Sequence, residues 1–264
     1  MEKIKELREK SGAGIVDCKK ALEESGGDID KAVEILRKKG IAKAAKRGER
    51  EASEGMVLVD VNKNGNEGYI LEINSETDFV ARNEQFRNFA GQVFDLIKKD
   101  KPADLGELMK LSMETGNVQE SLDNLSGTIG EKLSIKKFDI LSGQSVADYS
   151  HLGGRIGVLV SLNKSGQADL ARDIAMQVAA ANPKYIKPED VPVEELEKEK
   201  EIYREQLKKE GKPENIIEKI LEGKIKKYYE EVCLIKQEYI KDDKKKVKDI
   251  LGEIEMEKFV RYSL

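Results

Sequence analysis

Apolar residues recur at helical spacing in three short runs within the first forty residues of the chain. Breaks that contain glycine, at residues 11–14 and 25–28, separate the runs. The apolar positions are Ile4 and Leu7, then Ile15, Cys18 and Leu22, then Ile29, Val33 and Leu36. Asp28 precedes the third run, where an aspartate can cap the free N–H groups of a helix. The pattern predicts a three-helix bundle over residues 1–40, and its small core favours a role in partner contact.

Residues 41–54 differ in composition from the runs before them. They are charged and rich in alanine, and their apolar residues do not form a broad face. Such a stretch is typical of a linker or of an exposed helix between two modules. We therefore place a domain boundary near residue 54.

The next part of the chain has the pattern of a sheet covered by helices. Met56–Val61 and Gly68–Asn74 predict two strands, with Asn64 and Gly65 as the positive-φ residues of a hairpin turn. A strong apolar stripe then predicts a helix that lies on this sheet: Phe86, Phe89, Ala90, Val93, Phe94 and Ile97. A second helix is expected through Leu122, Leu125, Ile129 and Leu133, and a strand through Ile135, Phe138 and Ile140. We assign residues 55–143 to a first core subdomain.

The second half repeats the order of strand and packing helix. Arg155–Leu162 alternates like a half-buried strand, and a helix through Leu170, Ile174 and Val178 follows it and ends at Asn182-Pro183. Further helix and strand signals return at Val247–Leu251 and Lys258–Tyr262. We assign residues 144–191 and 233–264 to a second core subdomain. The predicted fold class is therefore α+β, with a core of two subdomains.

Residues 192–232 change in composition to Glu and Lys with scattered Leu, Ile and Tyr. Gly211-Lys212-Pro213 divides this segment and indicates a sharp reversal between two antiparallel helices. The apolar seam along the two helices is narrow. The segment is therefore predicted to be a protruding, coiled-coil-like helical hairpin inserted into the second subdomain.

Charge and apolar content restrict the classes of partner. The chain has 47 Lys and Arg against 51 Asp and Glu, so its net charge of −4 gives no general basic excess for nucleic acid or an anionic membrane. Its longest apolar runs are far shorter than the roughly 20 residues that a bilayer span needs. Met1-Glu2-Lys3 opens a charged helix rather than a signal peptide. We expect a soluble, cytoplasmic protein without direct nucleic-acid or membrane binding.

Few residue patterns in the chain could support covalent chemistry. His151 is the only histidine, and Cys18 and Cys233 lie far apart without a CxxC pair, so no catalytic triad, metal site or disulfide framework is indicated. The phosphate-loop motif is absent, and Gly153–Gly157 precedes a strand rather than a helix. We expect no enzymatic activity, cofactor or metal, and two buried, reduced cysteines. A hydrolase that uses paired carboxylates has the least support.

Thr77-Asp78-Phe79-Val80 falls in the connection between the second strand and the long helix. A phenylalanine there has two interpretations. Phe79 folds back onto Phe86 while Asp78 caps the helix, or Phe79 stays exposed and enters a partner's pocket. In the second case the neighbouring carboxylate would disturb a cation or phosphate site of the partner. The residues alone leave both interpretations open.

Two segments of the chain are similar to signatures of one protein family. EINSETDFVA, residues 72–81, resembles the internal signature of translation elongation factor Ts, and LREKSGAGIVDCKKAL, residues 7–22, resembles its N-terminal signature. Residues 149–160 and 211–229 also resemble family segments. The similarity covers nearly the whole chain. It implies an N-terminal module like a ubiquitin-associated (UBA) domain, an α+β core of two subdomains and a helical hairpin.

The resemblance also implies a function and a partner. The chain would be a guanine nucleotide exchange factor for elongation factor Tu, a GTPase that delivers aminoacyl-tRNA to the ribosome, and would bind it with GDP and without nucleotide. The loop of Thr77, Asp78, Phe79 and Val80 would intrude beside the magnesium site of elongation factor Tu and help to dislodge the ion. Burial of one phenylalanine contributes roughly 1.5–3 kcal/mol, so the remaining effect requires a wide interface.

Further contacts follow from the same comparison. The histidine of the family's glycine-rich segment matches His151, which would contact the same GTPase domain, and we predict that Ile15 and Val16 extend the interface. Family members differ in whether they form dimers and whether they continue into a terminal helix. For a chain that ends at Leu264, the resemblance therefore leaves a homodimer open.

A binding protein of another class is the main alternative. In that hypothesis, the N-terminal bundle grips a helix or a ubiquitin-like surface, and the Thr77–Val80 loop is structural. Binding to other partners, with no binding to elongation factor Tu, would favour this alternative.

Overall fold

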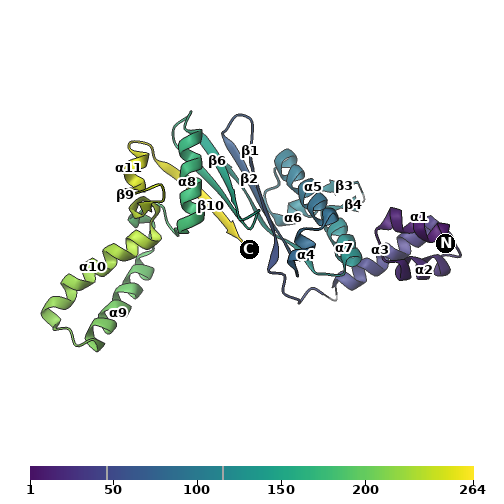
Figure 1. The fold of residues 1–264 in the computed structure, drawn as a ribbon, viewed down its shortest axis with the longest axis horizontal. Helices are drawn as coiled ribbons and strands as arrows, with labels where there is room; N and C mark the ends of the chain where they lie inside the picture. Colours follow the sequence, from purple (N-terminus) through teal and green to yellow (C-terminus); the bar gives the residue numbers. More distant parts are fainter. Residues whose placement is uncertain (46, 115) are drawn as a thin grey trace.

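The computed structural model describes residues 1–45, 47–114 and 116–264, and its elements have an elongated arrangement (Figure 1). Helices α1 (Glu2–Ser11), α2 (Ile15–Glu24) and α3 (Ile29–Ala45) lie at one end. Helices α9 (Val193–Lys209) and α10 (Glu214–Val232) project at the other end. Two three-stranded antiparallel sheets lie between them, each with helices on its outer face. The fold class is therefore α+β, as the sequence predicts.

The predicted breaks separate the three N-terminal helices from one another. Gly12 ends α1 in a left-handed conformation with φ 66°, and its N–H donates to Arg8 O. At the start of α3, Asp28 Oδ1 accepts a hydrogen bond from Lys31 N at 3.1 Å, which confirms the predicted cap. The buried core of these helices is small and consists of six residues: Leu7, Ala13, Cys18, Ala21, Leu22 and Ala32.

Helix α3 extends beyond the predicted bundle and packs against α7 (Val118–Ile129). The two helices cross at a pair of glycines, because a Cβ placed on Gly127 would lie 2.4 Å from Cα of Gly40. One turn earlier on α3, Arg37 Nη2 lies 2.5 Å from Glu120 Oε2. Of the predicted linker, residues 41–45 belong to α3, position 46 lies outside the described residues, and residues 47–53 run irregularly to the first strand. The crossing fastens the N-terminal helices to the core.

The first sheet has the strand order β1-β2-β5, with β1 at Glu54–Val61, β2 at Glu67–Ser75 and β5 at Leu133–Ser142. The predicted hairpin of β1 and β2 is confirmed, but its turn differs. Only Gly65 of the two predicted turn residues has positive φ, at 67°, and its N–H donates to Asn62 O. A turn of this kind needs a single left-handed residue, so Asn64 keeps a negative φ.

Helices α5 (Glu84–Asp100) and α7 cover the outer face of the first sheet. All six residues of the predicted stripe on α5 are buried, which confirms the stripe. Between the helices come α6 (Leu105–Leu108) and the short strands β3 (Ser112–Met113) and β4 (Gly116–Asn117). The placement of Leu133 in the second helix is wrong. Gly130 ends α7 with a left-handed φ of 90°, so Leu133 becomes the first residue of β5.

The second sheet has the order β10-β7-β6, from β6 (Ser145–His151), β7 (Ile156–Leu162) and β10 (Met256–Ser263). Helix α8 (Ala168–Ala181) covers its outer face and ends at Asn182, as predicted. The prediction of a half-buried β7 is wrong, because all its residues after Ile156 are buried. Strand β7 is central in its sheet, and it has α8 on one face and the first sheet on the other.

The two sheets pack face to face through a shared apolar cluster: Val57, Ile70, Leu141, Leu159, Val260 and Tyr262. Two glycines allow this close approach. A Cβ placed on Gly157 of β7 would lie 2.5 Å from Val57 Cγ1, and a Cβ placed on Gly68 of β2 would lie 2.8 Å from Leu159 Cδ2. Both distances are far below ordinary carbon contacts of about 3.5–4.0 Å, so the spacing of the sheets depends on these glycines.

Helices α9 and α10 lie side by side and are joined at residues 210–213 (Figure 1). Gly211 has a positive φ of 74° and Pro213 precedes the first residue of α10, at the predicted reversal. The chain then returns to the second sheet through the 3-10 turn Leu234–Lys236 and three short elements: β8 (Glu238–Tyr239), β9 (Asp242–Lys246) and α11 (Val247–Leu251).

Cys18 and Cys233 are both buried and both free, as expected. Burial raises the pKa of the Cys233 thiol to about 11, so it stays protonated at neutral pH. Within the part of the chain that the structure describes, no helix has the length and apolar character needed to cross a bilayer.

Candidate functional site

The segment Thr77–Val80 forms the cap and first turn of a four-residue helix, α4 (Asp78–Ala81), which follows β2. Thr77 Oγ1 accepts a hydrogen bond from Val80 N at 3.4 Å. Val80 is 9% exposed and belongs to the core of the first subdomain, whereas Phe79 is 80% exposed. One residue therefore anchors the turn, and its neighbour lies in solvent.

The position of Phe79 excludes one of its two interpretations. The interpretation in which Phe79 covers Phe86 is wrong, because Phe79 is exposed while Phe86 is completely buried in the core. Asn83, not Asp78, caps α5, and its Oδ1 accepts hydrogen bonds from Gln85 N at 2.8 Å and from Phe86 N at 3.4 Å. An aromatic ring left in water gains nothing from folding, so the ring is available to a partner.

Asp78 lies beside Phe79 with a partly exposed carboxylate. Its Oδ2 lies 2.9 Å from Arg82 Nη2, one helical turn further along the chain. Exposed ion pairs of this kind contribute about 0.2–1 kcal/mol. Asp78 can therefore exchange Arg82 for another cation at little cost in free energy.

The turn between β6 and β7 lies at the same end of the two sheets as α4. Gly154 O accepts a hydrogen bond from Val57 N at 2.7 Å, and Arg155 Nη1 lies 2.5 Å from Glu54 Oε2 at the start of β1. Hydrogen bonding to Glu54 raises the pKa of Arg155, and the charge of Asp78 acts in the same direction. The second subdomain thus contributes a positively charged turn beside the Asp78 carboxylate.

His151 and Leu152 belong to this turn. His151 is exposed at the end of β6, where its Nδ1 lies 3.3 Å from the Tyr149 hydroxyl and the two rings stack. Leu152 has a positive φ of 52° and is 63% exposed. The sequence patterns did not single out Leu152. The feature that could have identified it is an apolar residue between a histidine and two glycines. Together with Phe79, it places a second exposed apolar side chain at this end of the sheets.

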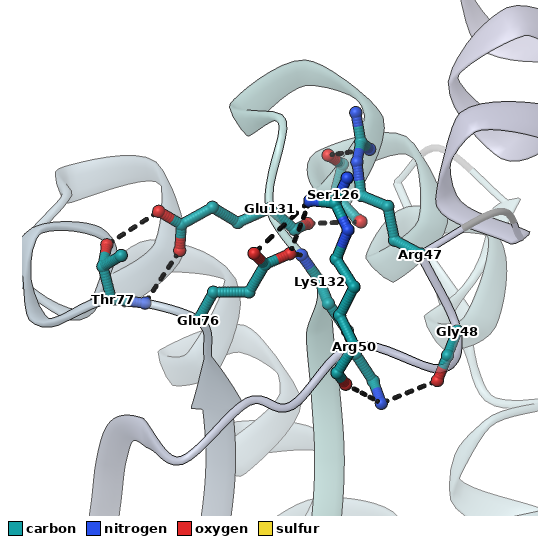
Figure 2. Close-up of polar contacts among 8 residues, drawn as sticks. All are labelled: Arg47, Gly48, Arg50, Glu76, Thr77, Ser126, Glu131 and Lys132. Carbon is teal, nitrogen blue, oxygen red and sulfur yellow. Dashed lines mark hydrogen bonds and ion pairs between the residues drawn. The ribbon is translucent and has the colours of Figure 1, made fainter.

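Two carboxylates fix the backbone that leads into α4 (Figure 2). Glu131 accepts hydrogen bonds from Thr77 N at 3.0 Å and from Thr77 Oγ1 at 2.7 Å. Glu76 accepts a hydrogen bond from Lys132 N at 2.6 Å. Each glutamate thus binds the residue that follows the other glutamate, and the end of β2 is braced against the start of β5.

The same network reaches the segment between α3 and β1 (Figure 2). Arg50 Nη1 lies 3.2 Å from Glu76 Oε1, and Lys132 Nζ donates to Gly48 O and Arg50 O at 2.8 Å each. Arg47 donates to a backbone oxygen of α7 at 3.1 Å. Residues 47–50 are therefore held against the first subdomain. Sequence reasoning missed these residues, because each contact joins positions that are distant in the chain.

Ile15 and Val16 begin α2, where they are 58% and 65% exposed. Figure 1 shows that α2 and α4 lie apart along the length of the molecule. The structure therefore brings His151 to the same end of the sheets as Thr77–Val80, and it places Ile15 and Val16 in a separate exposed pair on the N-terminal helices.

An exposed aromatic side chain on a turn that the core holds in place is typical of a protein that docks on a partner. Among the described residues, no group of three or more His, Cys, Asp or Glu side chains could hold a metal ion. The fold and this site thus define a partner-binding protein with an α+β core.

The family described as Elongation factor TS matches residues 76–264, a range that includes both Thr77–Val80 and His151. The chain belongs to this family. Membership implies a nucleotide exchange factor for elongation factor Tu in translation elongation, rather than a catalyst of covalent chemistry.

Acid is expected to weaken the network around Glu76. The hydrogen bond from Lys132 N is the main cause that lowers the pKa of Glu76 from its ordinary value of 4.5, and Arg50 adds to it. The stabilisation by Glu76 is therefore complete above about pH 4.5 and is lost as the pH falls through the lower pKa of the folded state. Glu76→Gln should lower the Tm at pH 7 by about 2–4 °C, and this difference should shrink below pH 4.5.

Calorimetry of both proteins between pH 7 and pH 3 tests this expectation. A difference in Tm that stays constant over the whole range would show that the ionised carboxylate of Glu76 does not contribute.

Proposed function

We propose that the chain promotes release of GDP from elongation factor Tu by inserting Thr77–Val80 beside the magnesium site of that GTPase. The observation that carries the proposal is the position of Phe79, whose side chain is 80% exposed on a turn anchored by Val80. Membership in the elongation factor Ts family supplies the partner. Translation elongation also makes the cytoplasm the proposed location.

Phe79 and Asp78 have different roles in this proposal. The ring of Phe79 enters an apolar pocket of the partner, and its burial contributes roughly 1.5–3 kcal/mol. Asp78 brings a carboxylate close to Mg²⁺ coordination, which requires a nearly ideal octahedron and tolerates little displacement of its ligands. The weak exposed pair with Arg82 leaves Asp78 free to make this approach.

Exchange requires more binding energy than one side chain provides. Each tenfold loss of nucleotide affinity corresponds to about 1.4 kcal/mol of coupling between factor and nucleotide, so Phe79 accounts for only about one or two powers of ten. The proposed interface therefore extends to His151 and Leu152 on the β6–β7 turn, and to Ile15 and Val16 on α2. Their exposure supports this extension.

Release of fluorescent GDP tests the proposal directly. Elongation factor Tu is loaded with the fluorescent nucleotide, excess unlabelled GDP is added, and the decay is followed with and without substoichiometric amounts of the chain. Acceleration by a small fraction of an equivalent is the expected result, because an exchange factor is released and acts again. Stable binding without acceleration, even at one equivalent, would contradict the proposal.

A further inference from the structure

We propose that Glu131 is the positioning residue of the Thr77–Val80 turn, and that its carboxylate sets the direction in which Phe79 points. The inference rests on the proposed function, because it concerns how the same turn is presented to elongation factor Tu. Glu131 acts through Thr77 and needs no contact of its own with the partner.

The carboxylate of Glu131 projects from a rigid base. Gly130 ends α7 immediately before it, and β5 begins two residues after it. The backbone oxygen of Glu131 accepts a hydrogen bond from Ser126 Oγ at 2.6 Å, and Ser126 is only 3% exposed. Both α7 and β5 contribute to the apolar core of the first subdomain. The position of Glu131 is therefore set by the core and not by the turn that it binds.

Hydrogen bonds connect Glu131 to the backbone next to Phe79 in two steps. Glu131 accepts from both Thr77 N and Thr77 Oγ1, at 3.0 and 2.7 Å. The hydroxyl proton of Thr77 is thereby used toward Glu131, which leaves an oxygen lone pair to accept from Val80 N at 3.4 Å. Phe79 lies between these two fixed positions. Its backbone direction follows from the contact between Glu131 and Thr77.

A second carboxylate braces the same turn from the opposite direction. Glu76 precedes Thr77 and accepts from Lys132 N at 2.6 Å, so residues 76–77 and 131–132 hold each other reciprocally (Figure 2). Arg50 adds a contact to Glu76 from the segment that follows α3. The bond of Glu131 differs from these contacts because it reaches the N-cap of α4 itself. Glu131 is therefore the residue whose loss should affect the presentation of Phe79 most directly.

A carboxylate matches the two donors of Thr77. A carboxylate accepts two hydrogen bonds on two oxygens, which matches the N–H and O–H of one threonine. The two donors meet different oxygens of Glu131, and glutamine has an acceptor at only one of these two positions, so in the same geometry it satisfies one donor. We therefore expect a graded series in which Glu131→Ala is more affected than Glu131→Gln.

The full-length protein and the variants Glu131→Ala, Glu131→Gln and Thr77→Val are compared in the fluorescent GDP assay. At saturating factor, the rate of release should fall about tenfold in Glu131→Ala and about threefold in Glu131→Gln. The concentration of factor at half-saturation should change less than about twofold, because the rest of the interface is intact. Thr77→Val removes the hydroxyl at nearly constant volume, and its effect should not add to that of Glu131→Ala.

A matched control separates positioning from a general loss of a carboxylate. Glu107 is an exposed residue of α6, and its Oε2 accepts a hydrogen bond from Ala103 N at 2.8 Å in the same subdomain. Glu107→Ala should exchange GDP at the wild-type rate. A structural readout accompanies the kinetics, since the backbone N–H groups of Thr77 and Val80 should exchange with solvent about tenfold faster in Glu131→Ala, with the strands of both sheets unaffected.

The outcomes distinguish this inference from the proposed function. If wild-type protein releases GDP and Glu131→Ala does so equally fast, the inference is wrong and the proposed function stands. If wild-type protein fails to accelerate release, the proposed function is wrong, and hydrogen exchange at Thr77 and Val80 still decides whether Glu131 holds the turn. If Glu131→Ala unfolds, Thr77→Val tests the same contact, and full activity with unchanged protection at Val80 would overturn the inference.

Discussion

Replacement of Phe79 by alanine is expected to slow GDP release from elongation factor Tu by about ten- to a hundredfold and to leave the Tm of the factor unchanged. The first effect follows from the loss of roughly 1.5–3 kcal/mol of burial at the proposed interface. The second follows from the 80% exposure of the side chain, which contributes almost nothing to the folded core. Substoichiometric release of fluorescent GDP and calorimetry measure the two quantities.

A matched control uses another exposed apolar residue. Val193, the first residue of α9, is 73% exposed, and α9 lies apart from α4 (Figure 1), so Val193→Ala should retain the wild-type rate. Phe79→Leu should fall between wild type and Phe79→Ala, because leucine retains part of the apolar surface. A drop of several degrees in the Tm of Phe79→Ala together with normal exchange would show that Phe79 serves the fold instead.

Gly157→Ala is expected to lower the stability of the protein by overpacking the interface of the two sheets. The new Cβ would lie 2.5 Å from Val57 Cγ1 and 2.8 Å from Val59 Cγ1, between two β-branched side chains in the interface of the sheets. Overpacking of this kind costs about 1–3 kcal/mol, which corresponds to a fall in Tm of about 2–12 °C for a domain of this size. Gly157→Val should be more severe.

Replacement of Gly91 by alanine should instead increase the stability of the protein. Gly91 lies inside α5, and no atom outside its own helix lies within 4 Å of a Cβ placed there. Alanine is favoured over glycine in a helix interior by about 1 kcal/mol, so Gly91→Ala should raise the Tm slightly. Denaturant titrations of both variants measure the difference. An unchanged midpoint for Gly157→Ala would mean that the two sheets can move apart at little cost.

Local patterns in the sequence predict the parts of the fold that depend on neighbouring residues. The stripe from Phe86 to Ile97 places α5 correctly, because its six apolar residues repeat at helical spacing and all face one core. Gly12 and Asp28 mark the end of α1 and the start of α3 correctly, because helix ends depend on the residues next to them in the chain. In the candidate site, the sequence identifies Thr77–Val80 but cannot decide whether Phe79 is buried.

Long-range contacts explain what the sequence does not predict. Strand β7 alternates like a strand with one solvent face, yet both faces are buried because a second sheet lies on it. Glu131 and Thr77 are 54 positions apart, so no local pattern relates them. With 51 acidic residues in the chain, the glutamates that brace the turn cannot be told from those on solvated faces.

The crossing of α3 and α7 at Gly40 and Gly127 has a consequence for avidity. It holds Ile15 and Val16 on α2 at a set separation from Phe79, where a flexible tether would let the two patches sample many distances. Once one patch is bound, the effective concentration of the other is high only toward a surface that matches this separation. For the proposed interface, the glycine pair therefore makes the distance between Phe79 and the Ile15–Val16 pair a criterion by which the partner is selected.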